Sequence, residues 1–256
     1  MPTWNAEHYL RYADERNQAA ADLVSRIKLH APKTIFDLGC GPGNSTQILR
    51  ARWPHADIVG IDRSCEMIAA ARQSFPDQNW LIADASAWHP TLPADLVYSN
   101  AALHWLPRHE SLIPHLFSQV APGGAFAFQI PSRTYPTIRK LIHDLSDDEE
   151  WTERMAKARN ALTLETPAFY YDVLSREATD INIWETEYFH VFESKDSIVD
   201  WMASTGLRPF LEALNTQDEQ NRFLKELGSR ANAAYETRID GKVLFPFRRL
   251  FVIAYR

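Results

Sequence analysis

The alternation of short apolar segments with helical segments between residues 34 and 131 constrains the fold more than any other feature of this sequence. Strand patterns occupy residues 34–39, 57–62, 79–84, 95–100 and 125–130. These strands are almost continuously apolar, which is typical of a parallel sheet that is covered on both faces. Because crossovers between parallel strands are right-handed, we expect a doubly wound α/β fold with a mostly parallel sheet.

Helices are predicted after the first, second and fourth of these strands, with Ser64 as the cap of one of them, and "PGG" at 122–124 is predicted to form a turn. After residue 131 helical patterns dominate, apart from strand patterns at 181–192 and 243–256 that should complete a seven-stranded sheet. The segment 194–214 is expected to give two helices broken at Gly206 and Pro209, followed by a capping box at Thr216. We expect one domain over 1–256, with a cofactor-binding half (1–131), a helical cap and substrate region (132–242) and a final strand (243–256).

The segment "DLGCGPGNST" connects the first strand to a helix, and its glycines Gly39, Gly41 and Gly43 follow a G-x-G-x-G spacing. A dinucleotide loop has the spacing G-x-G-x-x-G, and a P-loop needs a lysine that this segment lacks. Asp37 would repel a pyrophosphate, but it would attract an ammonium group. The helix that begins at Asn44 would favour a carboxylate. The loop therefore favours the methionine end of S-adenosylmethionine over a nicotinamide dinucleotide or a nucleoside triphosphate.

Ligands of doubly wound folds bind at the carboxyl ends of the strands, and acids follow two of these ends here. Asp62 ends the second strand, where a carboxylate binds both hydroxyls of a ribose. Asp84 follows the third strand and is predicted to accept a hydrogen bond from adenine, with a turn cap as the alternative. For Met67, contact with the adenine and packing in the core are both open.

The segment "SNAALHWL" follows the fourth strand and is expected to lie beside the reacting end of the cofactor. The small Ala101 would let the methyl donor approach closely, and His104 and Trp105 are expected to orient the acceptor. A structural hydrogen bond is the alternative for His104.

These motifs, in this order and together with "GIDRS", "LIADAS" and "APGG", resemble the class I S-adenosylmethionine-dependent methyltransferases. The segments "WNAEHYLRYADER", "FYYDVLS", "IWETEYFHVF" and "FPFRRLFVIAYR" are similar to the trans-aconitate 2-methyltransferase family within that class. The resemblance implies methylation of one carboxylate of trans-aconitate, with Tyr9 and Arg16 closing over the cofactor. The complete set of predicted cofactor-binding residues is Tyr9, Arg16, Asp37, Gly39, Cys40, Gly41, Asn44, Asp62, Arg63, Met67, Ala83, Asp84, Ala85, Asn100 and Ala101.

A carboxylate acceptor is already ionised at neutral pH, so its methylation requires no general base. It requires orientation and cationic groups that hold the carboxylates that do not react. Arg248 and Arg249 must point to opposite faces of the last strand, and we choose Arg248. The predicted substrate-binding residues are Arg133, Tyr170, Tyr171, Arg208 and Arg248, with surface exposure or packing as the alternative for each.

Three other functions stay open. A methyltransferase that acts on a hydroxyl would need a base, and His104 could serve. A nicotinamide oxidoreductase is opposed by the glycine spacing and by Asp37. A domain that binds the cofactor without turnover is the third.

Composition narrows the partners. A formal net charge of -6 and a pI of about 5.8 do not indicate nucleic-acid binding. Two cysteines, no leader pattern and no long apolar run favour a cytoplasmic protein away from membranes. The histidines lack paired metal-ligand spacing, and a monomer is the simplest expectation.

Overall fold

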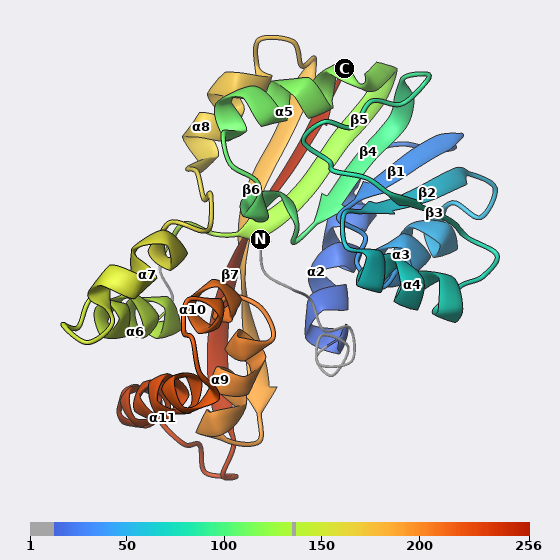
Figure 1. Ribbon diagram of the computed structural model, residues 1–256. Helices are drawn as coiled ribbons and strands as arrows, with labels where there is room; N and C mark the ends of the chain where they lie inside the picture. Colours follow the sequence, from blue (N-terminus) through green and yellow to red (C-terminus); the bar gives the residue numbers. More distant parts are fainter. Residues whose placement is uncertain (1–12, 135–136) are drawn as a thin grey trace. The chain divides into compact units, whose positions relative to one another are not determined.

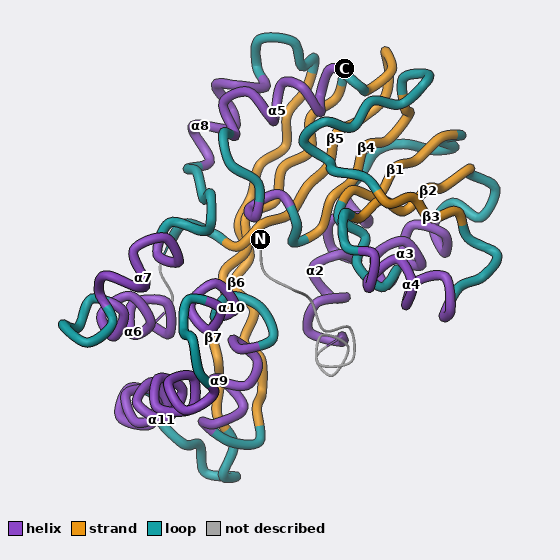
Figure 2. Tube along the Cα trace, viewed as in Figure 1, coloured by secondary structure: helices purple, strands orange, loops and turns teal. Residues whose placement is uncertain are grey.

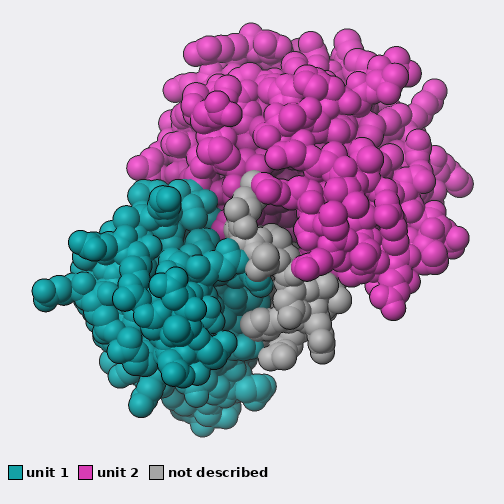
Figure 3. All heavy atoms as spheres, viewed as in Figure 1, with its two compact units in different colours: residues 1–3, 134–162, 187–248 teal, residues 4–133, 163–186, 249–256 magenta. Residues whose placement is uncertain are grey.

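The computed structural model describes residues 13–134 and 137–256, with side chains from residue 17 onward (Figure 1). Contacts divide the chain into two compact units, which are coloured separately in Figure 3. Unit 2 comprises 4–133, 163–186 and 249–256, and unit 1 comprises 1–3, 134–162 and 187–248. Each unit is described by itself. The predicted functional division at residue 131 stays a prediction.

The sheet has the seven strands that were predicted, and they lie in the order β3-β2-β1-β4-β5-β7-β6 (Figure 2). Strands β1 to β5 pair in parallel, whereas β7 runs antiparallel to β5. The order reverses between β1 and β4, and in open α/β sheets ligands bind at such a switch point. The strands are β1 (Thr34–Leu38), β2 (Asp57–Asp62), β3 (Asn79–Ile82), β4 (Ala94–Asn100), β5 (Val120–Pro131), β6 (Asp180–Phe192) and β7 (Val243–Tyr255).

Helices cover both faces of the sheet in unit 2. Neighbouring residues of a strand point to opposite faces, so each strand contacts helices on both sides. Tyr98 faces α2, where its hydroxyl donates to the Ala20 carbonyl at 3.2 Å. Val97 faces the other side and packs in one apolar cluster with residues of α5 and α8. The helices of unit 2 are α2 (Ala13–Arg26), α3 (Asn44–Arg52), α4 (Cys65–Ser74), the 3-10 helix η1 (Leu103–Trp105), α5 (His109–Ser118) and α8 (Pro167–Leu174).

The segment "PGG" was predicted as a turn that precedes a strand, but it lies inside β5. Ala94 pairs with Val120, and Leu96 pairs with Ala125, so four residues of β5 face one residue of β4. The glycine-rich segment is therefore a bulge, in which Gly123 supplies a φ of 81°. The turn residues were recognised, whereas continued pairing on both sides of them was not.

Unit 1 consists of helices together with parts of β6 and β7. Trp201 packs edge-on against Phe245 and Phe247, at ring-centroid distances of 5.3 and 4.9 Å. The capping box at Thr216 is confirmed. The two predicted helices are present as α9 and α10, with Gly206 between them, but Pro209 lies in the first turn of α10 rather than in the break. Proline is tolerated there because no helical partner is needed for its nitrogen. The helices are α6 (Thr137–Ser146), α7 (Thr152–Arg159), α9 (Lys195–Ala203), α10 (Arg208–Glu212) and α11 (Gln217–Ala234).

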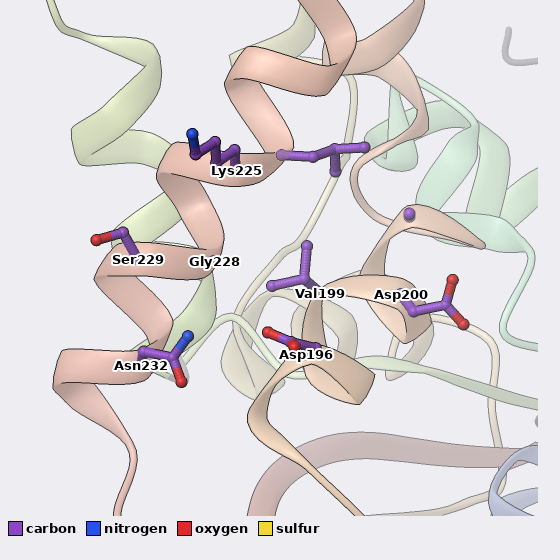
Figure 4. A pocket seen from close by; sticks show the side chains of 9 residues that line it. Asp196, Val199, Asp200, Lys225, Gly228, Ser229 and Asn232 are labelled. Carbon is purple, nitrogen blue, oxygen red and sulfur yellow. The ribbon is translucent and has the colours of Figure 1, made fainter.

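An open groove of roughly 630 Å³ lies in unit 1 between α9 and α11 (Figure 4). Asp196 and Val199 line it from α9, and Lys225, Ser229 and Asn232 line it from α11. No helix in the described part of the chain is long and apolar enough to cross a membrane. Among the same residues, no group of three His, Cys, Asp or Glu side chains is placed to hold a metal ion.

Candidate active site

The glycine turn after β1 is held tightly on one side and open on the other. The amides of Gly39 and Cys40 both donate to the Ile61 carbonyl of β2, at 2.7 and 3.0 Å. Gly39 has a φ of +73°, and a Cβ placed there would lie 2.1 Å from the Ala102 Cβ. A Cβ on Gly41 would meet no atom within 4 Å. The backbone at Gly41 therefore faces open space, which a ligand could approach.

Asp37 is fully buried at the end of β1. The hydroxyls of Ser45 and Thr46, in the first turn of α3, donate to its Oδ2 at 2.7 and 2.6 Å. Its Oδ1 is buried and has no hydrogen-bond partner in the described part of the chain. Burial raises the pKa of Asp37 to about 6 against these two hydrogen bonds, and the charge of Asp62 raises it further. A buried carboxylate oxygen that lacks a donor and lies near a second carboxylate fits the ammonium group of a methionine moiety.

Asp62 braces the turn from the end of β2. Its Oδ2 accepts the Gly41 amide at 3.0 Å, and its Oδ1 accepts the Ser64 amide at 2.8 Å. Burial raises the pKa of Asp62, although these hydrogen bonds act against the shift. Each carboxylate oxygen retains a second lone pair, so Asp62 can still accept from the hydroxyls of a ribose.

Asp84 is exposed beyond β3, and its Oδ1 accepts from the amide and the hydroxyl of Ser86 at 2.9 and 2.7 Å. Partial burial raises the pKa of Asp84, but the bonds from Ser86 outweigh it and leave the pKa below its ordinary value. Asp84 therefore caps a turn, and adenine recognition through it stays a prediction. Ala83 and Ala85 flank it, both half-buried.

The segment after β4 is anchored from both sides. The Ala101 amide donates to the Gln129 carbonyl at 2.9 Å, and Ala101 adopts a φ of 54°, which is unusual for alanine. His109 Nε2 lies 3.0 Å from the Leu103 carbonyl, and His109 Nδ1 lies 2.7 Å from the Tyr170 hydroxyl. Burial lowers the pKa of His109, which keeps the ring neutral and consistent with both bonds. Asn100, at the start of the segment, has a buried Oδ1 that no described residue contacts through a hydrogen bond.

His104 and Trp105 lie together in η1, with ring centroids 5.1 Å apart. His104 is only 5% exposed, and its carbonyl accepts the Thr163 amide at 2.9 Å. The structure thus places the two rings against each other in the segment that follows β4, while their part in orienting the acceptor stays a prediction.

Three other predicted cofactor residues differ in exposure. Met67 is 3% exposed on the buried face of α4, and the Ser64 hydroxyl caps this helix by accepting the Met67 amide at 3.3 Å. Cys40 is buried, which raises the pKa of its thiol, and its Sγ would lie 3.1 Å from a Cβ on Gly60. Arg63 is exposed. Tyr9 and the side chain of Arg16 lie outside the described residues.

The predicted substrate-binding residues are spread over both units. Arg133 follows β5 in unit 2 with an exposed side chain, and its Nη1 lies 3.9 Å from Glu165 Oε2. Tyr171 is 54% exposed on α8. Arg208 and Arg248 belong to unit 1, where they lie 3.9 Å from Glu212 and 3.2 Å from Glu187.

Tyr170 was predicted to bind substrate, with packing as the alternative, and the structure places it fully buried in the core of unit 2, facing His109. Burial raises the pKa of its hydroxyl. The position next to an exposed tyrosine was correctly identified as helical, but the helix phase that turns Tyr170 inward was not considered.

Known proteins resemble this chain over its full length. A family profile described as a methyltransferase domain matches residues 9–210. A trans-aconitate 2-methyltransferase of Azoarcus sp. is 44% identical over 256 residues, which is the whole of both chains. One of Klebsiella pneumoniae is 42% identical and covers 99% of this chain and 98% of its own. This chain belongs to the trans-aconitate 2-methyltransferase family.

Solved structures agree with the family at the level of the fold. The YcgJ protein of Bacillus subtilis has a TM-score of 0.62 at 13% identity, over 93% of this chain and 99% of its own. The phosphoethanolamine N-methyltransferase 2 of Haemonchus contortus, solved with S-adenosylhomocysteine, has a TM-score of 0.58 at 13% identity, over 93% of this chain and 52% of its own. These structures show the Rossmann-like class I methyltransferase fold for this member of the trans-aconitate 2-methyltransferase family.

Two polar residues of this family member were missed in the sequence. Gln129 of β5 is fully buried, and Arg249 of β7 is 3% exposed. Arg249 Nη1 donates to Gln129 Oε1 at 3.3 Å. The alternation of β7 indicated that Arg248 and Arg249 face opposite sides, but it could not say which side is buried. A polar residue in the apolar run "AFAFQI" was the signal for Gln129.

Proposed function

We propose that this chain transfers the methyl group of S-adenosylmethionine to a carboxylate of trans-aconitate, which gives the monomethyl ester and S-adenosylhomocysteine. The observation that carries the proposal is the full-length match to enzymes named trans-aconitate 2-methyltransferase, at 38 to 44% identity. The glycine turn and the acids at the carboxyl ends of β1 and β2 support the same cofactor.

The residues present suit this cofactor. Asp37 Oδ1 would accept the ammonium group, and the turn at Gly41 leaves room for the backbone of the methionine moiety. Asp62 would bind the ribose while it continues to hold the Gly41 amide. Ala101 and the small side chain of Ala102 would leave the reacting end accessible. When bound, the cofactor supplies an electrophilic methyl group on its sulfonium.

The protein's part in the reaction is then orientation and exclusion of water. The acceptor carboxylate is ionised at neutral pH and attacks without a base, provided that its oxygen is held about 3–3.5 Å from the methyl carbon and in line with the bond that breaks. The apolar surroundings of η1 reduce competing hydration of that oxygen. Arg133 is proposed to bind one of the carboxylates that do not react, because its side chain is exposed just beyond β5.

Residues 1–131 are proposed to hold the cofactor, and residues 132–242 to supply contacts to the acceptor. We further propose a cytoplasmic monomer that binds no nucleic acid, on the net charge of -6 and the two cysteines.

A methyl-transfer assay followed by mass spectrometry tests the proposal. The purified chain is incubated with S-adenosylmethionine and, separately, with trans-aconitate, cis-aconitate, isocitrate, citrate and a phenolic acceptor. We expect trans-aconitate to gain the mass of one methyl group. Saponification should hydrolyse this methyl ester and regenerate trans-aconitate. Methylation of the phenol alone would instead support the function that acts on hydroxyl groups.

A further inference from the structure

The register of three neighbouring strands brings Gln129 and Arg249 to the reacting end of the site. Asn100 of β4 is the Cα partner of Gln129 in β5, and Pro131 is the partner of Arg249 in β7. Gln129 and Arg249 are therefore diagonal neighbours on one face of the sheet. The Gln129 carbonyl accepts the Ala101 amide, so Gln129 lies directly beside the segment that follows β4.

The orientation of the Gln129 amide follows from its one contact with a charged group. Its Oε1 accepts from Arg249, which directs Nε2 the other way. The Gln129 side chain is completely enclosed, and its Nε2 has no hydrogen-bond partner among the residues that the structure describes. A buried donor without an acceptor is unfavourable, and native proteins retain very few of them. An acceptor atom from outside the chain would complete this site.

The charge of the neighbouring group selects the kind of acceptor. Arg249 carries its guanidinium into the same buried place, and a cation there favours an anionic oxygen over a neutral one. A carboxylate offers two oxygens, which suits one donor from an amide and others from a guanidinium.

The acid of the site lies on the same face, two strands away. Asp37 of β1 pairs with Tyr98 of β4, two residues before Asn100, so its carboxylate shares the face of Asn100 and Gln129. Asp37 Oδ1 and Asn100 Oδ1 are unpartnered acceptors, whereas Gln129 Nε2 is an unpartnered donor. On this face, β1 and β4 therefore present hydrogen-bond acceptors, whereas β5 and β7 present hydrogen-bond donors.

We propose that Gln129 and Arg249 form a subsite for one carboxylate of the acceptor that does not react, next to the acceptor groups that serve the ammonium end of the cofactor. The inference rests on the proposed function, because it assigns the substrate class of the same site. It makes these two residues determinants of specificity for polycarboxylates over acids with fewer carboxylates.

The test compares acceptors that differ by one carboxylate. Glutaconate, itaconate and mesaconate each lack a different carboxyl group of trans-aconitate. We would measure kcat/KM for trans-aconitate and the three diacids with the wild type and with Gln129→Met, which keeps the length of the side chain and removes Nε2. We expect kcat/KM for trans-aconitate to fall about 10- to 100-fold, as for a lost hydrogen bond to a charged group. The diacid that lacks the bound carboxylate should lose less than threefold.

Two controls protect this comparison. Gln119→Met changes a glutamine whose Nε2 bonds the His115 carbonyl at 3.2 Å, away from this face, and should leave all four values unchanged. Calorimetric titration of trans-aconitate into the complex with S-adenosylhomocysteine should show weaker binding for Gln129→Met, while the affinity for S-adenosylhomocysteine itself stays within twofold. This second measurement is independent of turnover.

The adjacent arginines give a further comparison. Arg249→Lys keeps a charge but loses the planar fork, and it should lower kcat/KM for trans-aconitate about tenfold. Arg249→Met removes the charge altogether and should lower kcat/KM further. A higher kcat/KM for Arg249→Lys than for Arg249→Met would show that a cation is needed there. If Arg248→Lys had the larger effect of the two lysine variants, Arg248 would hold the carboxylate and the inference would be wrong.

The remaining outcomes are equally decisive. An equal loss on all four acids would show that Gln129 is structural, with a buried water on its Nε2, and would overturn the subsite. If the wild type methylated none of the acids, the proposed function would fail instead, irrespective of the variants. If active Gln129→Met preferred trans-aconitate over the three diacids as strongly as the wild type does, the subsite would be wrong and the proposed function would stand.

Discussion

Two regions of unit 2 differ in how their residues are brought together: the proposed cofactor edge, formed by Asp37, Gly41 and Asp62, and the proposed acceptor edge, formed by Gln129 and Arg249. At the cofactor edge, Asp37 and its two donors in α3 are eight and nine residues apart. Asp62 reaches the Gly41 amide across 21 residues. At the acceptor edge, Gln129 and Arg249 are 120 residues apart and meet only because β7 inserts beside β5 in the antiparallel direction.

This difference decides which edge can be recognised in a sequence. A glycine turn needs particular residues at fixed spacing, because the backbone must adopt positive φ within a few residues. A pair formed across two distant strands leaves no spacing rule. The predictions below test whether the cofactor edge is as local, and the acceptor edge as divided, as this comparison implies.

The largest effect is expected for Asp62→Ala. This change removes the carboxylate proposed to bind the ribose hydroxyls, and with it the hydrogen bond that holds the Gly41 amide. Binding of S-adenosylmethionine should become undetectable by calorimetry. Asp57→Ala is the matched control, since Asp57 lies at the other end of β2, where its Oδ1 accepts from Asn79 Nδ2 at 3.2 Å. Unchanged affinity of Asp62→Ala would remove the assignment of this edge to the cofactor.

The next effect concerns two glycines of one turn. Gly39→Ala places a Cβ against Ala102 and at a φ of +73°, so we expect a loss of about 3 kcal/mol from overpacking and left-handed backbone together. Gly41→Ala meets open space and should lose about half as much stability, while it weakens cofactor binding more. Urea unfolding and calorimetry separate the two effects, and equal losses of stability would contradict the assigned close contact.

A pH effect of about tenfold is expected for cofactor affinity. The pKa of Asp37 rises from 3.8 to about 6 in the folded chain, so the folded state binds the proton more tightly than the unfolded state. Stability without cofactor should therefore decrease as pH rises from about 4 to 6.5, and Asp37→Asn should abolish that decrease. Binding of the ammonium group favours the carboxylate, so the dissociation constant should fall as pH rises through about 6. A flat profile in the wild type would argue against Asp37 as the partner of the ammonium group.

Arg133→Ala should raise KM for trans-aconitate by about tenfold, with little change in the affinity for S-adenosylmethionine, because its exposed side chain contributes a partly screened charge. Arg176→Ala, an exposed arginine of the same unit, is the control. If both variants behave alike, Arg133 is a surface charge, and the acceptor edge depends on other residues.

The smallest effect is expected for His104→Gln. Methylation of a carboxylate uses no base, and the bond from Thr163 is made to the backbone of His104, so it survives the change. The rate above pH 6 should fall less than about tenfold. A loss greater than about a thousandfold with normal binding would favour a hydroxyl acceptor and would make the acceptor edge catalytic.

Much of the fold was predictable because local signals agreed. Continuous apolar runs predicted β1, β2 and β4, and Ser64 and Thr216 predicted two helix starts that the structure confirms. The bulge at "PGG" was missed, since turn residues do not reveal whether pairing resumes across them. For Tyr170 the sequence left substrate contact and packing open, because a residue of a short helix is buried or exposed according to its neighbours in space, and the structure packs it in the core.

The sequence by itself determined the class of fold and predicted which loops hold the cofactor, because apolar periodicity and glycine spacing act over a few residues. Only the tertiary structure decided that Arg249 rather than Arg248 is buried, and that Gln129 meets it with an unpartnered amide nitrogen. Two adjacent side chains on a strand always point to opposite faces. Which face is enclosed depends on what packs against the sheet, and that is a property of the whole fold.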